Sequence, residues 1–342
     1  MKTTTLGYSD LVASRIALGC AKFGSEIRPC DAFDLIDLFV ERGGNLIDVP
    51  NGQSEFAVGS WLQRRSRADV MIVATGHFSG EPLSLTRSYL DTALDASLRV
   101  LGTDYIDLYQ VEGPDHQHGI EEVARFLEHA QASGKIRHAG TSRLTIVDLV
   151  CLDGATRALG ISPGVSFQSA SGYNLLERRI ESDILPVALT LGLGVIARGP
   201  LGSDWLTGRH RREQYLPADI DSSELPRPDA DPWSSRNIER TWRILDELGN
   251  VARETGLPPA NVALAWQLSR SGVATAIVEP RNSGQLAGLI PAAGIELDAR
   301  HLDRLTRVSE PPASRHETGW LNQLAIRERR EPELAGSGHR PA

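Results

Sequence analysis

The sequence alternates short apolar runs with helix-like segments eight times, and this alternation constrains the fold more than any other feature. A short apolar run that ends in turn residues is typical of a buried strand. The expected strands are Ile16–Leu18, Leu46–Asp48, Val70–Thr75, Tyr105–Val111, Ile136–Thr141, Val165–Gln168, Gly194–Ala197 and Ala274–Val278.

Helical spacing of apolar residues lies between these strands. The expected helices are Asp31–Arg42, Ser54–Arg65, Ser84–Leu101, Ile120–Ser133, Thr145–Leu159, Glu177–Thr190, Asn237–Thr255 with Pro258–Arg270, and Ser283–Leu289. Eight alternations predict an α/β fold, a (β/α)8 TIM barrel with a parallel sheet. In such a barrel the active site lies at the C-terminal ends of the strands, so the residues that follow each strand are the candidates for chemistry.

Some segments fall outside the alternation. Thr3–Arg15 is expected to form an N-terminal β-hairpin, and the Pro-, Asp- and Ser-rich stretch 202–236 is expected to form a long loop or insertion at the barrel mouth. We expect one barrel domain over residues 1–312 and a C-terminal tail over 313–342 that is partly disordered, with a short amphipathic stretch at Trp320–Ile326.

Composition restricts the partners. Thirty-six Lys and Arg against 44 Asp and Glu give a net charge of -8, and no basic block occurs, so we expect no nucleic-acid partner. Three scattered cysteines, the lack of a signal-peptide pattern and the lack of an apolar run of 18 residues predict a cytoplasmic protein without a membrane partner. The expected partner is a small-molecule metabolite, and the oligomeric state stays open.

Several phrases resemble those of the aldo-keto reductase superfamily, in order from Leu6 to about Leu305. They are ALGCAKFG (Ala17–Gly24), SLRVLGTDYIDLYQ (Ser97–Gln110), GKIRHAG (Gly134–Gly140), GPL (Gly199–Leu201), LTG (Leu206–Gly208) and LAW (Leu264–Trp266). The resemblance implies a TIM barrel, and the family's usual activity is the NADPH-dependent reduction of aldehydes and ketones.

The resemblance also implies positions for a catalytic tetrad of Asp, Tyr, Lys and His. Asp48 matches the Asp, but Asn51 stands in the Tyr position, Gly76 in the Lys position and Glu112 in the His position. An amide has no acidic proton to give, so the usual proton donor is replaced. Asp48 is interpreted as a catalytic carboxylate or as a strand-terminal cap, and without a neighbouring lysine its burial would favour the neutral acid.

The cofactor positions are altered as well. The family's Ser-Asn pair reads Ser142-Arg143, its Gln is matched by Gln168, and Arg281 takes the place of a basic residue that meets the 2′-phosphate. Gly288-Leu289 replaces the Glu-Asn pair that grips the adenine. These changes predict a vestigial cofactor site that binds NADPH weakly or not at all.

Other candidate substrate-binding residues follow the strands. They are Lys22, Asn51, His77, Arg143, Tyr173 and Arg198. Arg143 and Arg198 either bind a substrate carboxylate or phosphate or form structural ion pairs, and Tyr173 lies five residues after Gln168, beyond the usual place of the stacking aromatic. Glu112, Asp115, His116 and His118 do not have the spacing of a known metal site, so we expect no metal.

Three functions follow from these features. The leading hypothesis is a repurposed lyase or isomerase, in which Asp48 and Glu112 catalyse a non-redox dehydration, elimination or isomerisation of a small hydroxylated or carbonyl metabolite. The second is a non-catalytic binding or regulatory protein on the same fold. The third is an NADPH-dependent carbonyl reductase with an atypical active site.

Overall fold

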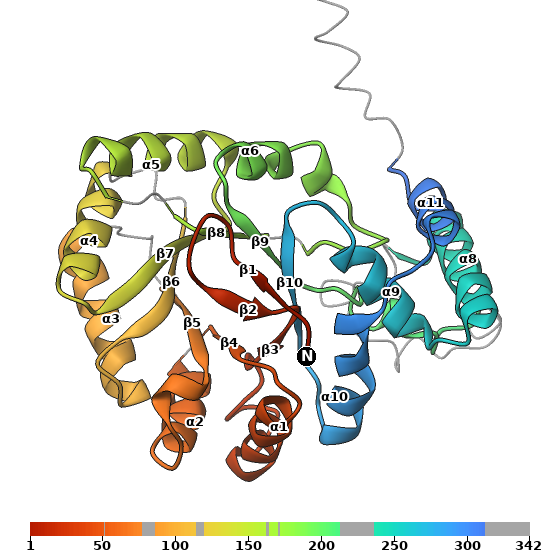
Figure 1. Ribbon diagram of the computed structural model, residues 1–342, viewed down its shortest axis with the longest axis horizontal. Coiled ribbons are helices and arrows are strands. Elements are labelled where there is room, and N and C mark those ends of the chain that lie inside the picture. The colour runs from red at the N-terminus through yellow and green to blue at the C-terminus, as the bar shows by residue number, and fades with distance from the viewer. Residues whose placement is uncertain are drawn as a thin grey trace, which may run out of the picture. The chain divides into compact units, whose positions relative to one another are not determined.

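The computed structural model describes residues 1–50, 52–76, 86–113, 120–161, 164–169, 172–212 and 236–311. Residues 1–309 form one compact unit. Eight parallel strands close into a barrel, each hydrogen-bonded to its neighbours in the order β10-β3-β4-β5-β6-β7-β8-β9 (Figure 1). The strands are β3 (Ile16–Gly19), β4 (Leu46–Val49), β5 (Met71–Gly76), β6 (Ile106–Glu112), β7 (Ile136–Ser142), β8 (Ser166–Gln168), β9 (Gly194–Ala197) and β10 (Val273–Val278). The predicted TIM barrel is therefore confirmed.

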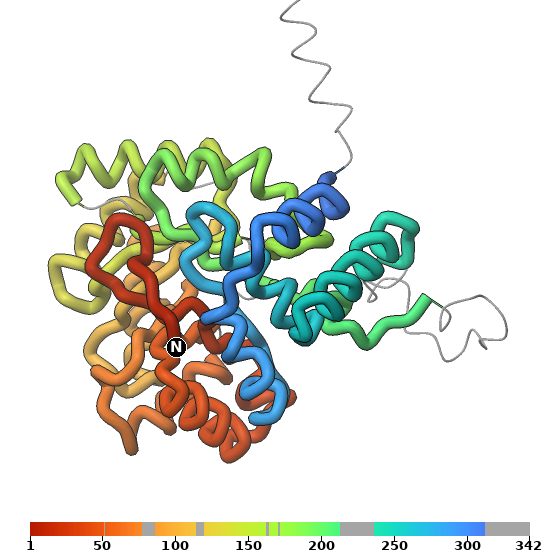
Figure 2. Tube along the Cα trace, turned by 45° about the vertical axis from the view of Figure 1, so that its right-hand side comes forward, coloured from red at the N-terminus to blue at the C-terminus, as the bar shows by residue number. Residues whose placement is uncertain are grey.

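Helices surround the barrel (Figure 1). They are α1 (Pro29–Glu41), α2 (Gly52–Leu62), α3 (Arg87–Leu101), α4 (Ile120–Ala132), α5 (Ile146–Ala158), α6 (Ile184–Thr190), α8 (Glu239–Thr255), α9 (Pro259–Leu268), α10 (Ser283–Leu289) and α11 (Ala299–Val308). α8 and α11 lie side by side in both views (Figure 1, Figure 2). Within the described ranges, no helix combines the length and the apolar character that a membrane crossing needs.

The predicted hairpin is present as β1 (Thr3–Thr5) and β2 (Val12–Ser14), which pair antiparallel. Leu6, Leu11 and Ala13 pack in the same buried cluster as barrel residues such as Leu46 and Leu108. Because these barrel residues point inward, the hairpin covers the N-terminal end of the barrel. The opposite end, where the strands have their C-terminal residues, is called the mouth.

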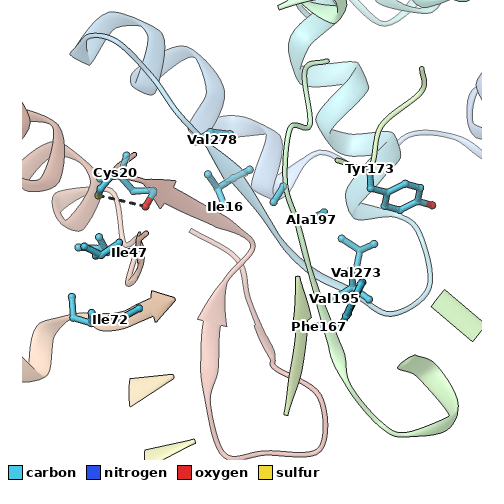
Figure 3. Packing of buried hydrophobic residues seen from close by; sticks show 14 of the residues in the cluster. Ile16, Cys20, Ile47, Ile72, Phe167, Tyr173, Val195, Ala197, Val273 and Val278 are labelled. Carbon is cyan, nitrogen blue, oxygen red and sulfur yellow. Dashed lines mark hydrogen bonds between the residues drawn. The ribbon is translucent and has the colours of Figure 1, made fainter. Parts of the chain in front are cut away.

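Alternation along the strands separates two core layers. Leu46 belongs to the inner cluster, whereas Ile47 and Val49 belong to the outer cluster between the strands and the helices. Successive strand side chains point to opposite faces, so Asp48 shares the inner face with Leu46. Figure 3 shows members of the outer layer, in which the buried Cys20 thiol lies 3.8 Å from the Leu18 carbonyl oxygen.

Two helix predictions need correction. The segment Glu177–Thr190 is not one helix, because a 3-10 turn at Arg179–Glu181 precedes α6. The Arg178 guanidinium donates to the Glu181 carboxylate and to the Thr306 carbonyl oxygen, both at 2.6 Å, and these bonds hold the turn. Helix α11 was not predicted at all. Its spacing of Leu302, Leu305 and Val308 is the signal that would have found it. Residues 213–235 and 312–342, which include most of the predicted insertion and the predicted tail, lie outside the described residues.

Candidate active site

The inward-facing residues at the strand ends gather several polar groups at the barrel mouth. All eight strands are parallel, so their C-terminal ends meet at one face. Asp48, Glu112, Ser142 and Gln168 end β4, β6, β7 and β8, or lie one residue before the end. Asp48 and Glu112 share the inward parity of Leu46 and Leu108. Ser142 is in register with both Glu112 and Gln168, so the topology brings these four sequence-predicted residues together.

Asp48 is a buried carboxylate with one oxygen that has no hydrogen-bond partner among the described residues. Its side chain belongs to a residue that is 1% exposed, and its Oδ1 atom has no hydrogen-bond partner in the described part of the chain. Burial raises the pKa of Asp48 to about 7, Arg198 lowers it and Glu279 raises it further. Since a buried charge is costly, a substantial share of Asp48 stays the neutral acid near neutral pH.

Glu279 is a mouth residue that the sequence reasoning missed. It follows β10 with the inward parity of Ile277, and its Cγ lies 2.8 Å from the place where a side chain on Gly19 would begin. Arg198, which follows β9, lies 4.0 Å from the Glu279 carboxylate. The available signal was the replacement of the family's Ile-Pro-Gly phrase by Ile277-Val278-Glu279.

Glu112 and Arg143 form an ion pair at the mouth. Arg143 Nη1 donates to Glu112 Oε1 at 2.7 Å, and the Glu112 side chain is 11% exposed. The pair follows from strand register, because Glu112 on β6 lies opposite Ser142 on β7. The bond engages a carboxylate oxygen that a proton shuttle would need, which counts against the predicted two-acid mechanism.

A second set of uncompensated groups lies at the end of β8. Gln168 is 2% exposed and Ser169 is fully buried. Among the residues that the structure describes, Gln168 Oε1 accepts no hydrogen bond, and Ser169 Oγ neither accepts nor donates one. Buried polar groups are normally bonded, so Gln168 Oε1, in register with Ser142 at the mouth, is suited to a polar ligand group there. Ser169 was not predicted, although it follows Gln168 directly.

Gly76, in the position of the family's lysine, faces the helix layer. Val73 is in the inner cluster and Ala74 in the outer one, so the alternation turns residue 76 outward. A Cβ on Gly76 would lie 2.7 Å from the Tyr109 hydroxyl oxygen. Tyr109 is fully buried, and its ring packs edge-on against Phe126 with centroids 5.8 Å apart. The side chain of Tyr109 thus fills the space beside Gly76.

Tyr173 packs away from this group. Tyr173 is fully buried against Trp266, with ring centroids 6.0 Å apart, and its hydroxyl donates to Glu181 at 2.6 Å. Burial raises the pKa of Tyr173 well above its ordinary value, and the Glu181 carboxylate adds to this. Trp266 on α9 and Glu181 thus occupy the ring and the hydroxyl of Tyr173, and its role in substrate binding stays a prediction.

Lys22 and Arg281 lie at the rim. Both approach Glu26, Lys22 at 3.8 Å and Arg281 at 3.6 Å. The Arg281 side chain is 65% exposed, so its guanidinium can reach an anion at the surface. Asn51 and His77, together with the Asp115, His116 and His118 cluster, lie outside the described residues.

Curated relatives of the chain are named as oxidoreductases. The uncharacterized oxidoreductase YrpG of Bacillus subtilis is 30% identical over 332 residues, which cover 91% of this chain and 97% of the relative. Norsolorinic acid reductase of Aspergillus flavus is 28% identical over 328 residues, covering 87% and 80%. Aldo-keto reductase YhdN of Bacillus subtilis is 26% identical over 324 residues, covering 91% and 94%.

These names contradict the leading hypothesis from the sequence. A non-redox lyase or isomerase has no counterpart among these relatives, whose names state oxidoreductase or reductase activity. The hypothesis gave too much weight to the replaced tetrad residues, which concern the proton donor rather than the hydride. The carbonyl-reductase alternative is the better supported one.

The family model agrees with the fold and with the quoted phrases. The model described as Aldo/keto reductase family matches residues 15–310, which span the whole barrel from β3 to α11. The chain belongs to the aldo/keto reductase family.

Proposed function

We propose that the protein is an NADPH-dependent oxidoreductase that reduces the carbonyl group of a small molecule to an alcohol. Membership of the family and the reductase names of the relatives support the reaction class. The observation that carries the mechanism is Asp48, a buried carboxyl with an unpartnered Oδ1 in the described structure and a pKa of about 7.

The residues at the mouth fit the nicotinamide end of the cofactor. Gln168 Oε1 can accept from the carboxamide NH2 group, and Ser142 lies beside Gln168 at the end of β7. Arg281 at the rim can meet a phosphate. When bound, the cofactor supplies the hydride. Because the adenine contacts of the family are replaced by Gly288-Leu289, we expect a dissociation constant above about 1 µM, weaker by several kcal/mol than a tight nucleotide site.

Asp48 supplies the proton in this proposal. Carbonyl reduction needs one proton at the oxygen as hydride reaches the carbon, and a general acid works best when its pKa is close to the working pH. Asp48 meets this condition. Two other acidic groups nearby do not: burial raises the pKa of the Cys20 thiol well above its ordinary value and also raises the pKa of the Tyr109 phenol.

The pair of Arg198 and Glu279 sets the acidity of Asp48. Arg198 favours the carboxylate and Glu279 opposes it. In a tetrad with a lysine, the ammonium lies next to the proton donor. Here Gly76 takes the lysine position and faces the helix layer. Arg198 is the cation whose charge lowers the pKa of Asp48. Arg198 thereby takes over an electrostatic role from a different strand.

The experiment measures NADPH binding by fluorescence and NADPH oxidation with model aldehydes at several pH values. Asp48→Asn should lower kcat by about 10²-fold, the scale of a general acid. In the unsubstituted protein kcat/KM should be constant below about pH 7 and fall about tenfold per pH unit above it, since only the protonated acid donates.

Two further variants test the assignment of that pH dependence. Glu279→Gln should move the fall to lower pH, and Arg198→Gln should move it to higher pH, because their charges act on Asp48 in opposite directions. Absence of NADPH binding would remove the redox proposal. Full activity of Asp48→Asn, or a rate that rises with pH through 7, would remove Asp48 as the acid.

A further inference from the structure

Arg143 adopts a backbone conformation that arginine rarely takes. Its φ angle is 59°, in the left-handed region, at the point where β7 ends and before Thr145 caps helix α5. Glycine, which has no Cβ, adopts this conformation freely. Side chains other than Asn and Asp are disfavoured there by contact between Cβ and the backbone. Such strain is typical of functional sites and has to be held by the surrounding structure, here in part by the Arg143 amide, which donates to the Gln168 carbonyl at 3.3 Å.

The guanidinium of Arg143 is directed to the mouth and is only partly used. Its side chain is 52% exposed, and the bond from Nη1 to Glu112 is the one side-chain hydrogen bond that it forms in the described structure. A guanidinium has five N–H donors in a planar fork, which matches the two oxygens of a carboxylate. Donors therefore remain for a second anion beside Glu112.

A second arginine on the same strand, Arg137, is held by two partners and serves as a structural comparison. Arg137, near the start of β7, lies 3.2 Å from the Asp107 carboxylate, and its guanidinium stacks on the Tyr105 ring at 4.1 Å. Arg137 lies toward the closed end of the barrel and has both an acid and an aromatic partner. Arg143 has only Glu112 among the described residues, and lies at the open end.

We propose that Arg143 anchors a carboxylate of the substrate, so that the enzyme prefers oxo acids, that is, aldehydes or ketones which also carry a carboxylate, to neutral carbonyl compounds. The preference rests on the proposed reductase function. Glu112 holds Arg143 when no substrate is bound and repels the incoming anion. The two residues therefore act in opposite directions: Arg143 raises the affinity for anions, and Glu112 limits it.

The first test is equilibrium binding of benzoate and benzamide, which have the same size but differ in charge. Binding is measured by calorimetry without cofactor and with NADPH, so it does not depend on turnover. We expect benzoate to bind more tightly than benzamide, and Arg143→Met to weaken benzoate binding by about tenfold or more while benzamide binding is unchanged, the scale of a lost charge-assisted hydrogen bond. Glu112→Gln should strengthen benzoate binding.

Two variants separate this effect from a loss of folding. Arg143→Gly, whose backbone suits the left-handed region, should lose the benzoate preference without loss of thermal stability. Arg137→Met removes an ion-paired arginine from the same strand and should keep the preference. Equal binding of benzoate by Arg143→Met and the unsubstituted protein, or no binding of benzoate at all, would overturn the proposal.

The second test compares kcat/KM for 4-formylbenzoate and 4-formylbenzamide. We expect a preference for 4-formylbenzoate that Arg143→Met abolishes through KM. Turnover with the preference intact in Arg143→Met would overturn the anchor and leave the reductase proposal standing. Arg143-dependent benzoate binding without any turnover would support the anchor and overturn the reductase proposal.

Discussion

Two buried aspartates, at opposite ends of the barrel, have opposite surroundings. Asp107, near the start of β6, is 2% exposed and is fully bonded: Arg67 Nη2 donates at 2.6 Å, the Ile72 amide at 2.9 Å and Arg137 Nη1 at 3.2 Å. Asp48, near the end of β4, is equally buried, but its Oδ1 has no partner in the described part of the protein. The same side chain is compensated at the closed end and uncompensated at the open end.

The difference follows from the use of the two ends of a TIM barrel. Groups at the N-terminal end of the strands serve stability, and groups at the C-terminal end serve chemistry. The guanidinium carbons of Arg67 and Arg137 lie 4.2 and 4.1 Å from the centroid of the Tyr105 ring, and these contacts hold both cations beside Asp107. At the mouth, Asp48 Oδ1 and Gln168 Oε1 are buried and have no hydrogen-bond partner among the described residues, which costs stability and leaves hydrogen-bonding capacity for a ligand.

The largest stability effect is expected at the closed end. Asp107→Ala should lower the free energy of unfolding by about 3–5 kcal/mol, because it leaves the Arg67 and Arg137 charges and the Ile72 amide without their acceptor. Urea denaturation at pH 7 measures this. Asp95→Ala, which removes a 46% exposed aspartate paired with Lys135, is the control and should cost less than about 1 kcal/mol. Equal losses in the two variants would break the comparison.

The opposite sign is expected at the mouth. The pKa of Asp48 is about 7 in the fold against an ordinary value of 3.8, so ionisation of Asp48 destabilises the fold. This penalty is absent below about pH 4, grows between the two pKa values and is complete above pH 7. As the pH rises, Asp48→Asn should therefore become more stable relative to the unsubstituted protein.

The measurement is the difference in unfolding free energy between Asp48→Asn and the unsubstituted protein. It should grow by about 2–3 kcal/mol in favour of the variant from pH 5 to pH 8.5, as one pKa unit corresponds to about 1.4 kcal/mol. A difference that does not depend on pH would mean that Asp48 has an ordinary acidity in the fold.

A smaller effect is expected behind the mouth, where Gly76 contacts Tyr109. A Cβ on residue 76 would meet the Tyr109 hydroxyl oxygen at 2.7 Å, so Gly76→Ala should cost about 1–3 kcal/mol by overpacking. In the Tyr109→Phe background the cost should fall below about 1 kcal/mol, because the hydroxyl is gone; a double-mutant cycle gives the coupling. The same cost in both backgrounds would show that another contact restricts residue 76.

The sequence predicted the candidate site in part. Asp48, Glu112, Ser142 and Gln168 were found because each lies at the end of an apolar run, and strand ends meet at the mouth. Glu279 and Ser169 directly follow predicted strands but were not singled out, because only the tertiary structure shows that the Glu279 charge reaches Asp48 and that Ser169 Oγ is buried without a partner among the described residues. The sequence did not show that the Tyr173 ring packs against Trp266 on α9, since a position five residues past a strand does not specify the direction in which a ring turns.

What the sequence determined by itself is what depends on local periodicity. The eight alternations specify the strands, their order and the end at which they carry polar residues, because the alternation of faces along a strand is a property of the backbone. The tertiary structure decided the environments: whether a carboxylate at a strand end keeps an oxygen without a partner in the described structure, as Asp48 does, or is paired, as Glu112 is with Arg143. Those outcomes depend on distances of a few ångströms between residues far apart in the chain, which only closure of the barrel sets.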